Sequence, residues 1–373
     1  MQQTKGPKPQ PITPAQATTK IMTLCRRSPR TTVTLYGPPG QGKTDLVHQA
    51  ADRLTADGLK TVVIAFHLVS MSPEDLGGVL CTIKNPDGSV RADKVPLHAL
   101  YKLIDPDCRI IAFGDDVGNA PPACQAAWMQ LVQSRCLNEH KISNEVMFVM
   151  ATNGRSHGTA ARPLIAALRD RAVEYTIETT VDSWSDWAMD NDIDERVIAF
   201  AGYYEQHLAN KEVSLHDWKP PQDDTDKHPT FRGLHRMSDM LKLGLDDYVD
   251  VRGNVGSAMA NAYMTFKALY DKMPDIDLLL KSPTTTPLPD HAGVAYAVTN
   301  ALLCRVRDNV KTAAPAEKYL TRLEKQTGGT YQAMPLVQTF VTRIMNLPNY
   351  GEVSVAMGNL VARHSQEITN RNS

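Results

Sequence analysis

The sequence predicts an α/β domain followed by a mostly helical second half. From Thr31 to Thr180, short β-rich runs alternate with longer helical stretches, which is the pattern of parallel strands joined by crossover helices. After about residue 181 the strand-like runs stop, and apolar residues recur at helical spacing instead, for example from Ser257 to Lys272. With 373 residues, the chain is long enough for two or three compact units.

Five candidate strands in the first half are almost continuous apolar runs. Runs of this kind are typically buried on both faces, as in a parallel sheet between two layers of helices. In chain order they read TTVTLY, TVVIAF, RIIAFG, EVMFVMA and AVEYTIE. We therefore expect a five-stranded parallel sheet within residues 13–180, preceded by a proline-rich flexible tail at residues 1–12 and a helix start at Thr13-Pro14.

Charge and composition exclude several classes of protein. The 40 basic and 41 acidic residues nearly cancel, so no global field attracts nucleic acid or anionic lipid, although a local basic patch stays possible. No apolar run approaches the ~20 residues that span a bilayer, and the N-terminus lacks the order of a secretory signal. The six cysteines form no C-x-x-C pair, which favours reduced thiols. We expect a cytoplasmic protein without a membrane anchor.

The motif with the clearest chemistry is GPPGQGKT, which fits the phosphate-binding pattern G-x-x-x-x-G-K-[ST] and lies between a β-run and a helical run. Glycines let successive backbone N–H groups turn toward phosphate oxygens, and helix onset at Lys43 adds the positive end of a helix dipole. Lys43 is suited to neutralise the β- and γ-phosphates, and the Thr44 hydroxyl to coordinate Mg²⁺. A glycine-rich turn that matches by chance is disfavoured by this context. The predicted ATP-binding residues are Gly37, Pro38, Pro39, Gly40, Gln41, Gly42, Lys43, Thr44 and Asp45.

A second acidic site follows the strand RIIAFGDD. Its two carboxylates fall at the carboxyl edge of the sheet, where ligands of open α/β folds bind. We expect Asp115 to hold the magnesium ion together with Thr44, and Asp116 to orient or deprotonate the water that attacks the γ-phosphate. Without the phosphate-binding loop, an Asp-Asp pair at a strand end would more often be a solvated turn or a helix cap.

The run GDDVGNAPPACQAAWMQLVQSR resembles the Walker B element and following helix of MoxR-like AAA+ ATPases over some twenty positions. The resemblance implies an AAA+ P-loop core with a five-stranded parallel sheet at residues 13–180, an α-helical lid at 181–250 and a helical C-terminal region at 251–373. It also implies ATP and Mg²⁺ as ligands, a homo-oligomeric ring with a hexamer favoured, and chaperone-like remodelling of protein partners. One such partner in this family carries a von Willebrand factor A domain.

The same resemblance assigns roles to four further residues. EVMFVMATNGRSHGTA resembles the sensor 1 strand and places Asn153 beside the γ-phosphate, although a lone Asn after a strand is usually a turn residue. RPLIAALRDRAVEYTIE resembles the arginine-finger segment, with Arg171 first and Arg169 second, and ordinary surface arginines are the alternative. HPTFRGLHRMSDML resembles the start of a lid helix and places Arg232 at sensor 2, with the family's proline replaced by Phe231.

The stretch after the second strand resembles the part of the family that carries loops facing the central pore. Lys84, Asn85, Asp87 and Arg91 would then touch a threaded or docked partner. A solvated turn at Pro86-Asp87-Gly88 is an equally good interpretation.

Two alternatives to a fast remodelling motor stay open. The family usually has Glu where this chain has Asp116, and the shorter side chain reaches a water less readily, which suggests a nucleotide-gated scaffold with slow turnover. The other is a DNA-handling AAA+ ATPase such as a helicase loader, against which the balanced charge and the absence of a DNA-reading motif argue.

Overall fold

A computed structural model describes residues 10–153, 164–205, 215, 226–326, 331 and 333–371. The chain divides into two compact units, one up to Thr179 and one mostly from Thr180 onward. Among the described residues, none of the helices has both the length and the apolar character needed to traverse a bilayer.

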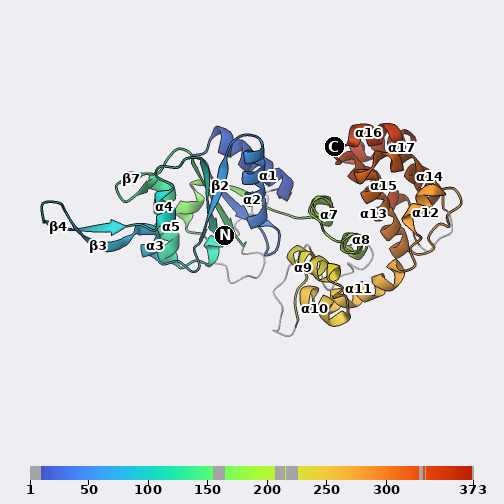
Figure 1. The fold of residues 1–373 in the computed structure, drawn as a ribbon, viewed down its shortest axis with the longest axis horizontal. Helices are drawn as coiled ribbons and strands as arrows, with labels where there is room; N and C mark the ends of the chain where they lie inside the picture. Colours follow the sequence, from blue (N-terminus) through green and yellow to red (C-terminus); the bar gives the residue numbers. More distant parts are fainter. Residues whose placement is uncertain are drawn as a thin grey trace, which may run out of the picture. The chain divides into compact units, whose positions relative to one another are not determined.

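The first unit is built on a five-stranded sheet in which every neighbouring pair is parallel, in the order β2-β5-β8-β1-β9 (Figure 1). The strands are β1 (Thr32–Tyr36), β2 (Thr61–His67), β5 (Arg109–Asp115), β8 (Val146–Thr152) and β9 (Ala172–Thr176). All five lie in the apolar runs that the sequence analysis selected, so the prediction of a five-stranded parallel sheet is confirmed. The predicted α/β core followed by a helical region is confirmed as well.

The central strands are buried on both faces because alternate side chains enter two different core clusters. On β5, Ile111 and Phe113 pack with helices α1 and α2, whereas Ile110 and Ala112 pack in the cluster that includes α5. Strand β8 is buried at every position. The helices of this unit are α1 (Pro14–Arg27), α2 (Lys43–Ala56), α3 (Pro73–Gly77), α4 (His98–Tyr101), α5 (Pro122–Ser134) and α6 (Ala166–Arg169).

Helix α1 begins where the sequence predicted a helix start. The Thr13 hydroxyl accepts from the backbone N–H of Gln16, and the Gln16 side chain accepts from the backbone N–H of Thr13. Pro14 occupies the first helical position, where its missing N–H costs nothing.

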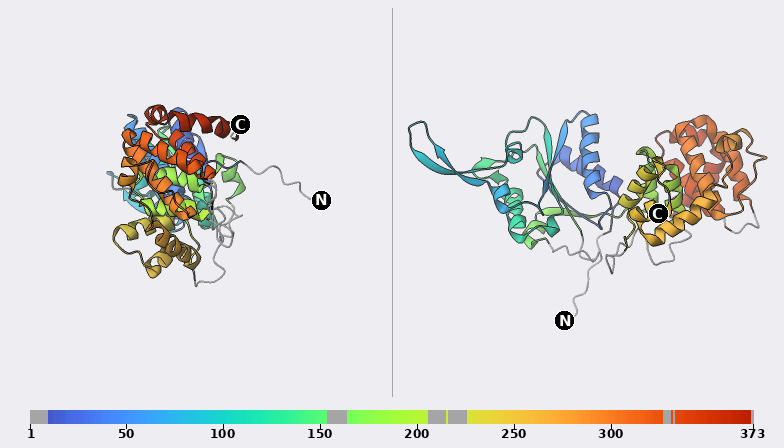
Figure 2. Two further views of the ribbon diagram at one scale, coloured as in Figure 1. Left: turned by 90° about the vertical axis from the view of Figure 1, so that its right-hand side faces the viewer. Right: turned by 60° about the horizontal axis from the view of Figure 1, so that its bottom comes forward.

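Two short antiparallel hairpins lie outside the main sheet, and neither was predicted from the sequence. They pair β3 (Val79–Lys84) with β4 (Val90–Val95), and β6 (Cys136–Leu137) with β7 (His140–Lys141). The first hairpin projects from the unit (Figures 1 and 2). The predicted turn at Pro86-Asp87-Gly88 forms its tip, where the Asn85 N–H donates to the Ser89 carbonyl at 2.8 Å. Most side chains of β3 and β4 are exposed, so no strong apolar run marked these strands.

The second unit consists of helices packed on one hydrophobic core that extends from Val181 to Val361. The segments assigned to a lid and to a C-terminal region therefore share this core. Phe200 lies at its centre, with ring contacts to Tyr263 and Phe266. The helices are α7 (Val181–Asp190), α8 (Glu195–Tyr203), α9 (Phe231–Lys242), α10 (Tyr248–Val255), α11 (Ser257–Tyr270), α12 (Ile276–Lys281), α13 (Ala292–Asp308), α14 (Ala313–Glu324), α15 (Met334–Met345), α16 (Tyr350–Ala356) and α17 (Gly358–Arg371), with a 3₁₀ turn at Val310–Thr312.

Candidate nucleotide-binding site

The strand order brings three predicted elements to one edge of the sheet. Strand β8 lies between β1 and β5, and all three run in the same direction. The GPPGQGKT loop follows β1, Asn153 follows β8, and Asp115 ends β5. Because the carboxyl ends of parallel strands meet at the same edge, residues more than 100 positions apart in the chain become neighbours there.

The loop backbone has the conformation that phosphate binding requires. Gly40 and Gly42 have φ values of 76° and 75°, in the left-handed region that favours glycine. Gly42 is the N-cap of α2 and makes no side-chain cap, so the first N–H groups of the helix stay available to an anion. Gly37 lies so close to the chain after β9 that a Cβ there would stand 2.9 Å from the Ile177 carbonyl oxygen.

Lys43 connects the loop to strand β8. Its Nζ donates to the carbonyl oxygens of Gly37 at 2.8 Å and Pro38 at 2.9 Å, and to Asn153 Oδ1 at 2.9 Å. All three acceptors are oxygens, the atom type that phosphate groups present. The ammonium group is therefore already held over the loop at a position where triphosphate oxygens would compete for its donors.

The Thr44 hydroxyl and the Asp115 carboxylate form the part of the site suited to a divalent cation. Thr44 Oγ1 donates to Asp115 Oδ2 at 3.5 Å, and His67 Nδ1 lies 3.9 Å from the same oxygen. A hydroxyl and a carboxylate are the hard oxygen donors that Mg²⁺ prefers. No group of three or more His, Cys, Asp or Glu side chains arranged for a metal occurs among the described residues. The donor set thus fits an ion that takes its other oxygens from water and from a nucleotide.

Asp116 is held by two amides. Its backbone is left-handed, with φ 53° and ψ 39°, at the start of the 3₁₀ turn η1 (Val117–Asn119). Asn119 Nδ2 donates to Asp116 Oδ2 at 2.7 Å, and Asn153 Nδ2 donates to Asp116 Oδ1 at 3.4 Å. The contact with Asn119 was not predicted, although an Asn three residues after an Asp that leaves a strand is a common turn pattern.

Gln41 contributes to this site through its backbone, because its side chain points away from the loop opening. Gln41 is 5% exposed, and its Oε1 accepts from the Thr179 N–H at 2.8 Å. The Thr179 hydroxyl donates back to the Gln41 carbonyl at 3.1 Å. Asp45, in the first turn of α2, is exposed, and Pro39 lies in the loop between the contacts described above. The side chain of Gln41 therefore anchors the loop to the segment that follows β9.

The two candidate arginine fingers differ in their surroundings. Arg169 makes two parallel hydrogen bonds to Glu174, from Nε at 2.9 Å and from Nη2 at 3.0 Å. Arg171 is exposed, and its Nη1 donates to the Ala167 carbonyl at 2.6 Å. Among the described residues, no carboxylate lies within ion-pair distance of Arg171. A guanidinium already satisfied by a carboxylate in its own chain is poorly suited to reach a neighbouring phosphate. Arg162, at the start of the same RPLIAALRDRAVEYTIE run, falls outside the described residues.

Arg232 belongs to the second unit, where it is the second residue of α9 and is exposed. Phe231, at the position of the family's proline, is 4% exposed and packs against Trp184 with a ring separation of 5.7 Å. Thr230 caps the helix by accepting from the Gly233 N–H. The Phe that replaces the family's proline therefore adds to the core of the unit, and the helix still begins with a capped turn.

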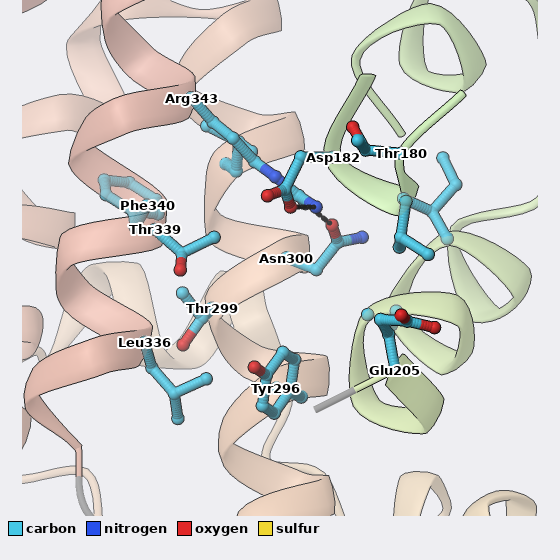
Figure 3. A pocket seen from close by; sticks show the side chains of 15 residues that line it. Thr180, Asp182, Glu205, Tyr296, Thr299, Asn300, Leu336, Thr339, Phe340 and Arg343 are labelled. Carbon is cyan, nitrogen blue, oxygen red and sulfur yellow. Dashed lines mark hydrogen bonds and ion pairs between the residues drawn. The ribbon is translucent and has the colours of Figure 1, made fainter. Parts of the chain in front are cut away.

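The second unit also contains a cavity of about 150 Å³, lined by apolar and polar side chains, which was not predicted from the sequence. Figure 3 shows Arg343 of α15 beside Asp182 of α7 and Asn300 of α13. Arg343 Nη2 donates to Asp182 Oδ1 at 3.2 Å, and Nη1 donates to Asn300 Oδ1 at 3.4 Å. None of the predicted site residues lines this cavity.

No family model matches the chain, and no curated protein matches it. Solved structures with a similar fold include C. elegans PCH-2, with 17% identity, a TM-score of 0.31, and coverage of 70% of this chain and 64% of that one. The Thermotoga maritima RuvB Holliday junction branch migration motor has 15% identity, a TM-score of 0.35, and coverage of 82% and 87%. NtrX from Brucella abortus in complex with ATP has 12% identity, a TM-score of 0.34, and coverage of 88% and 68%.

Proposed function

We propose that this chain is an AAA+ ATPase that binds Mg·ATP at the β1–α2 loop and hydrolyses it. The observation that carries the proposal is the convergence of Lys43, Thr44, Asp115, Asp116 and Asn153 at one edge of a parallel sheet, with Lys43, Asn153 and Asp116 joined by hydrogen bonds. A glycine-rich loop, a lysine, a hydroxyl and two carboxylates in this arrangement are the groups that binding and hydrolysis of a magnesium-bound nucleoside triphosphate require.

Each side chain has a role in hydrolysis that follows from its chemistry. Lys43 and the amides around Gly42 neutralise and orient the phosphate oxygens. Bound Mg²⁺, held by Thr44 and Asp115, would neutralise charge on the β- and γ-phosphates. Asp116 accepts a hydrogen bond from the attacking water, which adds to the γ-phosphorus as the bond to ADP breaks. Asn153 lies between Lys43 and Asp116 and orients the γ-phosphate or that water.

The remaining roles depend on assembly. We propose a homo-oligomeric ring, with six subunits favoured, in which Arg171 of one subunit stabilises the phosphoryl group bound by its neighbour. Arg232 would contact the same phosphate from the lid side. In this proposal the ring is a MoxR-like remodeller of protein clients. The resemblance to MoxR-like ATPases also predicts a partner protein with a von Willebrand factor A domain.

Phosphate release from Mg·ATP by the purified chain tests the proposal. We expect turnover that requires magnesium, disappears in Lys43→Ala, and rises under conditions in which mass measurement shows a ring. Absence of both nucleotide binding and turnover in folded protein would exclude an ATPase. Turnover that DNA stimulates, with a stimulation that falls steeply as salt rises, would instead favour a DNA-handling motor.

A nucleotide-gated scaffold with slow turnover is the second candidate, and the restraint on Asp116 favours it. Both carboxylate oxygens accept hydrogen bonds from amides, from Asn119 and from Asn153, and this side chain is one methylene shorter than the Glu of the family. Comparison of the wild type with Asp116→Glu separates the two candidates. A large gain in kcat indicates that the wild type is built for slow turnover, whereas a loss indicates that the site is adapted to Asp.

A further inference from the structure

A chain of three side chains connects the strand that carries the phosphate-binding loop to the segment that carries Arg171. Tyr36, the residue before Gly37, donates its hydroxyl to Glu174 Oε1 at 3.0 Å. Glu174, on β9, accepts both hydrogen bonds from Arg169 at the end of α6. Strands β1 and β9 are neighbours in the sheet, so the network lies on a rigid support.

The Arg169–Glu174 pair closes the turn in which Arg171 lies. Arg169 is the last residue of α6, Arg171 directly precedes β9, and Glu174 is the third residue of β9. The pair thus joins the two sides of the connection at points two residues before and three residues after Arg171. A bidentate pair fixes the guanidinium and carboxylate planes relative to each other, which a single contact does not. The turn is therefore held at both of its ends.

Electrostatics keep Glu174 charged and Tyr36 protonated. The hydrogen bonds from Arg169 lower the pKa of Glu174, so this carboxylate is ionised at neutral pH. Burial and the adjacent Glu174 raise the pKa of Tyr36, so its hydroxyl remains a donor. Both partners are in the states that the network needs across the pH range in which the protein would work.

We propose that Glu174 and Arg169 are positioning residues that hold Arg171 in the geometry needed to serve as the arginine finger, and that Tyr36 fixes this assembly to the strand of the phosphate-binding loop. The inference rests on the proposed ATPase function and deepens it, since it assigns Arg169 to support and leaves Arg171 as the residue that reaches the neighbouring nucleotide. A finger held in place loses less conformational entropy when the phosphate charge develops than a free surface arginine does.

An ordinary surface ion pair is the alternative, and exposure alone does not exclude it. The side chains of Arg169 and Glu174 are 55% and 31% exposed. An exposed pair without a functional role contributes little to stability, and its loss leaves turnover unchanged. The experiment must therefore measure a property that depends on the position of Arg171 and on which subunit supplies it.

The test uses Glu174→Gln in the full chain, with Asp57→Asn as the matched control. Asp57 forms an exposed ion pair with Arg26 in the same unit, away from the site. We expect Glu174→Gln to lower kcat about tenfold while the Kd for Mg·ATP stays unchanged, because a displaced catalytic group slows chemistry without weakening ground-state binding. Arg169→Lys, which keeps the charge but loses the bidentate geometry, should lower kcat as well, and Asp57→Asn should not.

Mixing subunits shows on which side of the interface the residue acts. Glu174→Gln subunits have an intact phosphate-binding loop, and Lys43→Ala subunits have an intact finger segment. Equimolar mixing should restore turnover above the sum of the separate proteins, because some interfaces then combine the two intact halves. Arg171→Ala should be rescued in the same way, which gives the positive control for action across the interface.

Three outcomes overturn the inference while leaving the ATPase proposal in place. The first is that Glu174→Gln turns over ATP as fast as the wild type. The second is that mixing with Lys43→Ala subunits rescues the turnover of Arg171→Ala but not that of Glu174→Gln. The third is that the wild type is fully active as a monomer. A lack of turnover in the wild type itself is a different result, since it contradicts the proposed function.

Discussion

The two units of this chain use polar side chains in different ways. In the first unit, the polar residues with assigned roles come from short contiguous motifs at the ends of adjacent parallel strands. In the second unit, Arg343, Asn300 and Asp182 come from three helices that lie up to 161 positions apart and meet around a cavity. At the sheet edge, the order of the strands determines which residues become neighbours. In a helical bundle, residues from different helices come together only through the packing of those helices.

In each unit, the residues that stabilise the fold can be compared with the residues that carry candidate chemistry. The second unit depends on one extended apolar core, and its cavity, which polar side chains line only in part, lies among residues of that core. The first unit carries its candidate chemistry at an edge outside its two core clusters. Substitutions in the core of the second unit should therefore alter stability, whereas substitutions at the sheet edge of the first unit should mainly alter ligand binding.

The largest effect is expected from the core of the second unit. Phe200 is fully buried and contacts the rings of Tyr204, Tyr263 and Phe266. Phe200→Ala should lower the free energy of unfolding by about 4 kcal/mol, because a large cavity replaces well-packed atoms. Urea unfolding followed by circular dichroism measures this loss. Leu278→Ala, at a position 60% exposed on α12, is the control and should change stability little.

Lys43→Ala should have the next largest effect, which is on nucleotide binding and not on stability. Loss of the charged donor removes contacts worth about 3 kcal/mol, which corresponds to about 100-fold weaker binding of Mg·ATP. Titration calorimetry checks this, with Lys60→Ala as the control because Lys60 is an exposed lysine paired with Asp107. If the two variants bound Mg·ATP with equal affinity, the loop would not be part of the nucleotide-binding site.

Gln41→Ala tests the anchor behind the loop. The Thr179 N–H would lose its acceptor in a buried position, and the expected cost is about 1.5 kcal/mol of unfolding free energy. Thermal unfolding with and without Mg·ATP measures both the cost and its effect on the site. A drop in nucleotide affinity as large as that of Lys43→Ala would show that the side chain acts on the ligand directly.

The smallest effect is expected from Arg343→Met. The Arg343 side chain is 10% exposed, and its Nε has no hydrogen-bond partner among the described residues. The side chain of its partner Asp182 is 71% exposed and can be hydrated. Replacing such a charge by an apolar side chain of similar length should change the unfolding free energy by less than about 1 kcal/mol. A loss above 3 kcal/mol in denaturant unfolding would show that the polar cluster holds the helices together.

The sheet and the first helix could be predicted because their signals are local and strong. The short apolar runs around Ile110 and Phe148 are typical of strands buried on both faces, and Thr13-Pro14 combines two helix-start preferences. The β3–β4 hairpin could not be predicted, since exposed residues such as Leu80 and Lys94 alternate without a buried face.

The candidate site was predictable as a set of residues but not as a set of contacts. The motifs selected Lys43 and Asn153, but only the sheet order places them 2.9 Å apart. The pairing of Arg169 with Glu174 and the contact of Gln41 with Thr179 depend on side-chain directions that spacing does not encode.

A structure of the purified chain with Mg²⁺ and a non-hydrolysable ATP analogue would reveal whether the β1–α2 loop binds nucleotide. We expect the triphosphate against the backbone from Gly37 to Thr44, with Lys43 Nζ on phosphate oxygens and the metal between the Thr44 hydroxyl and Asp115. Nucleotide bound anywhere else, or none at saturating concentration, would contradict it.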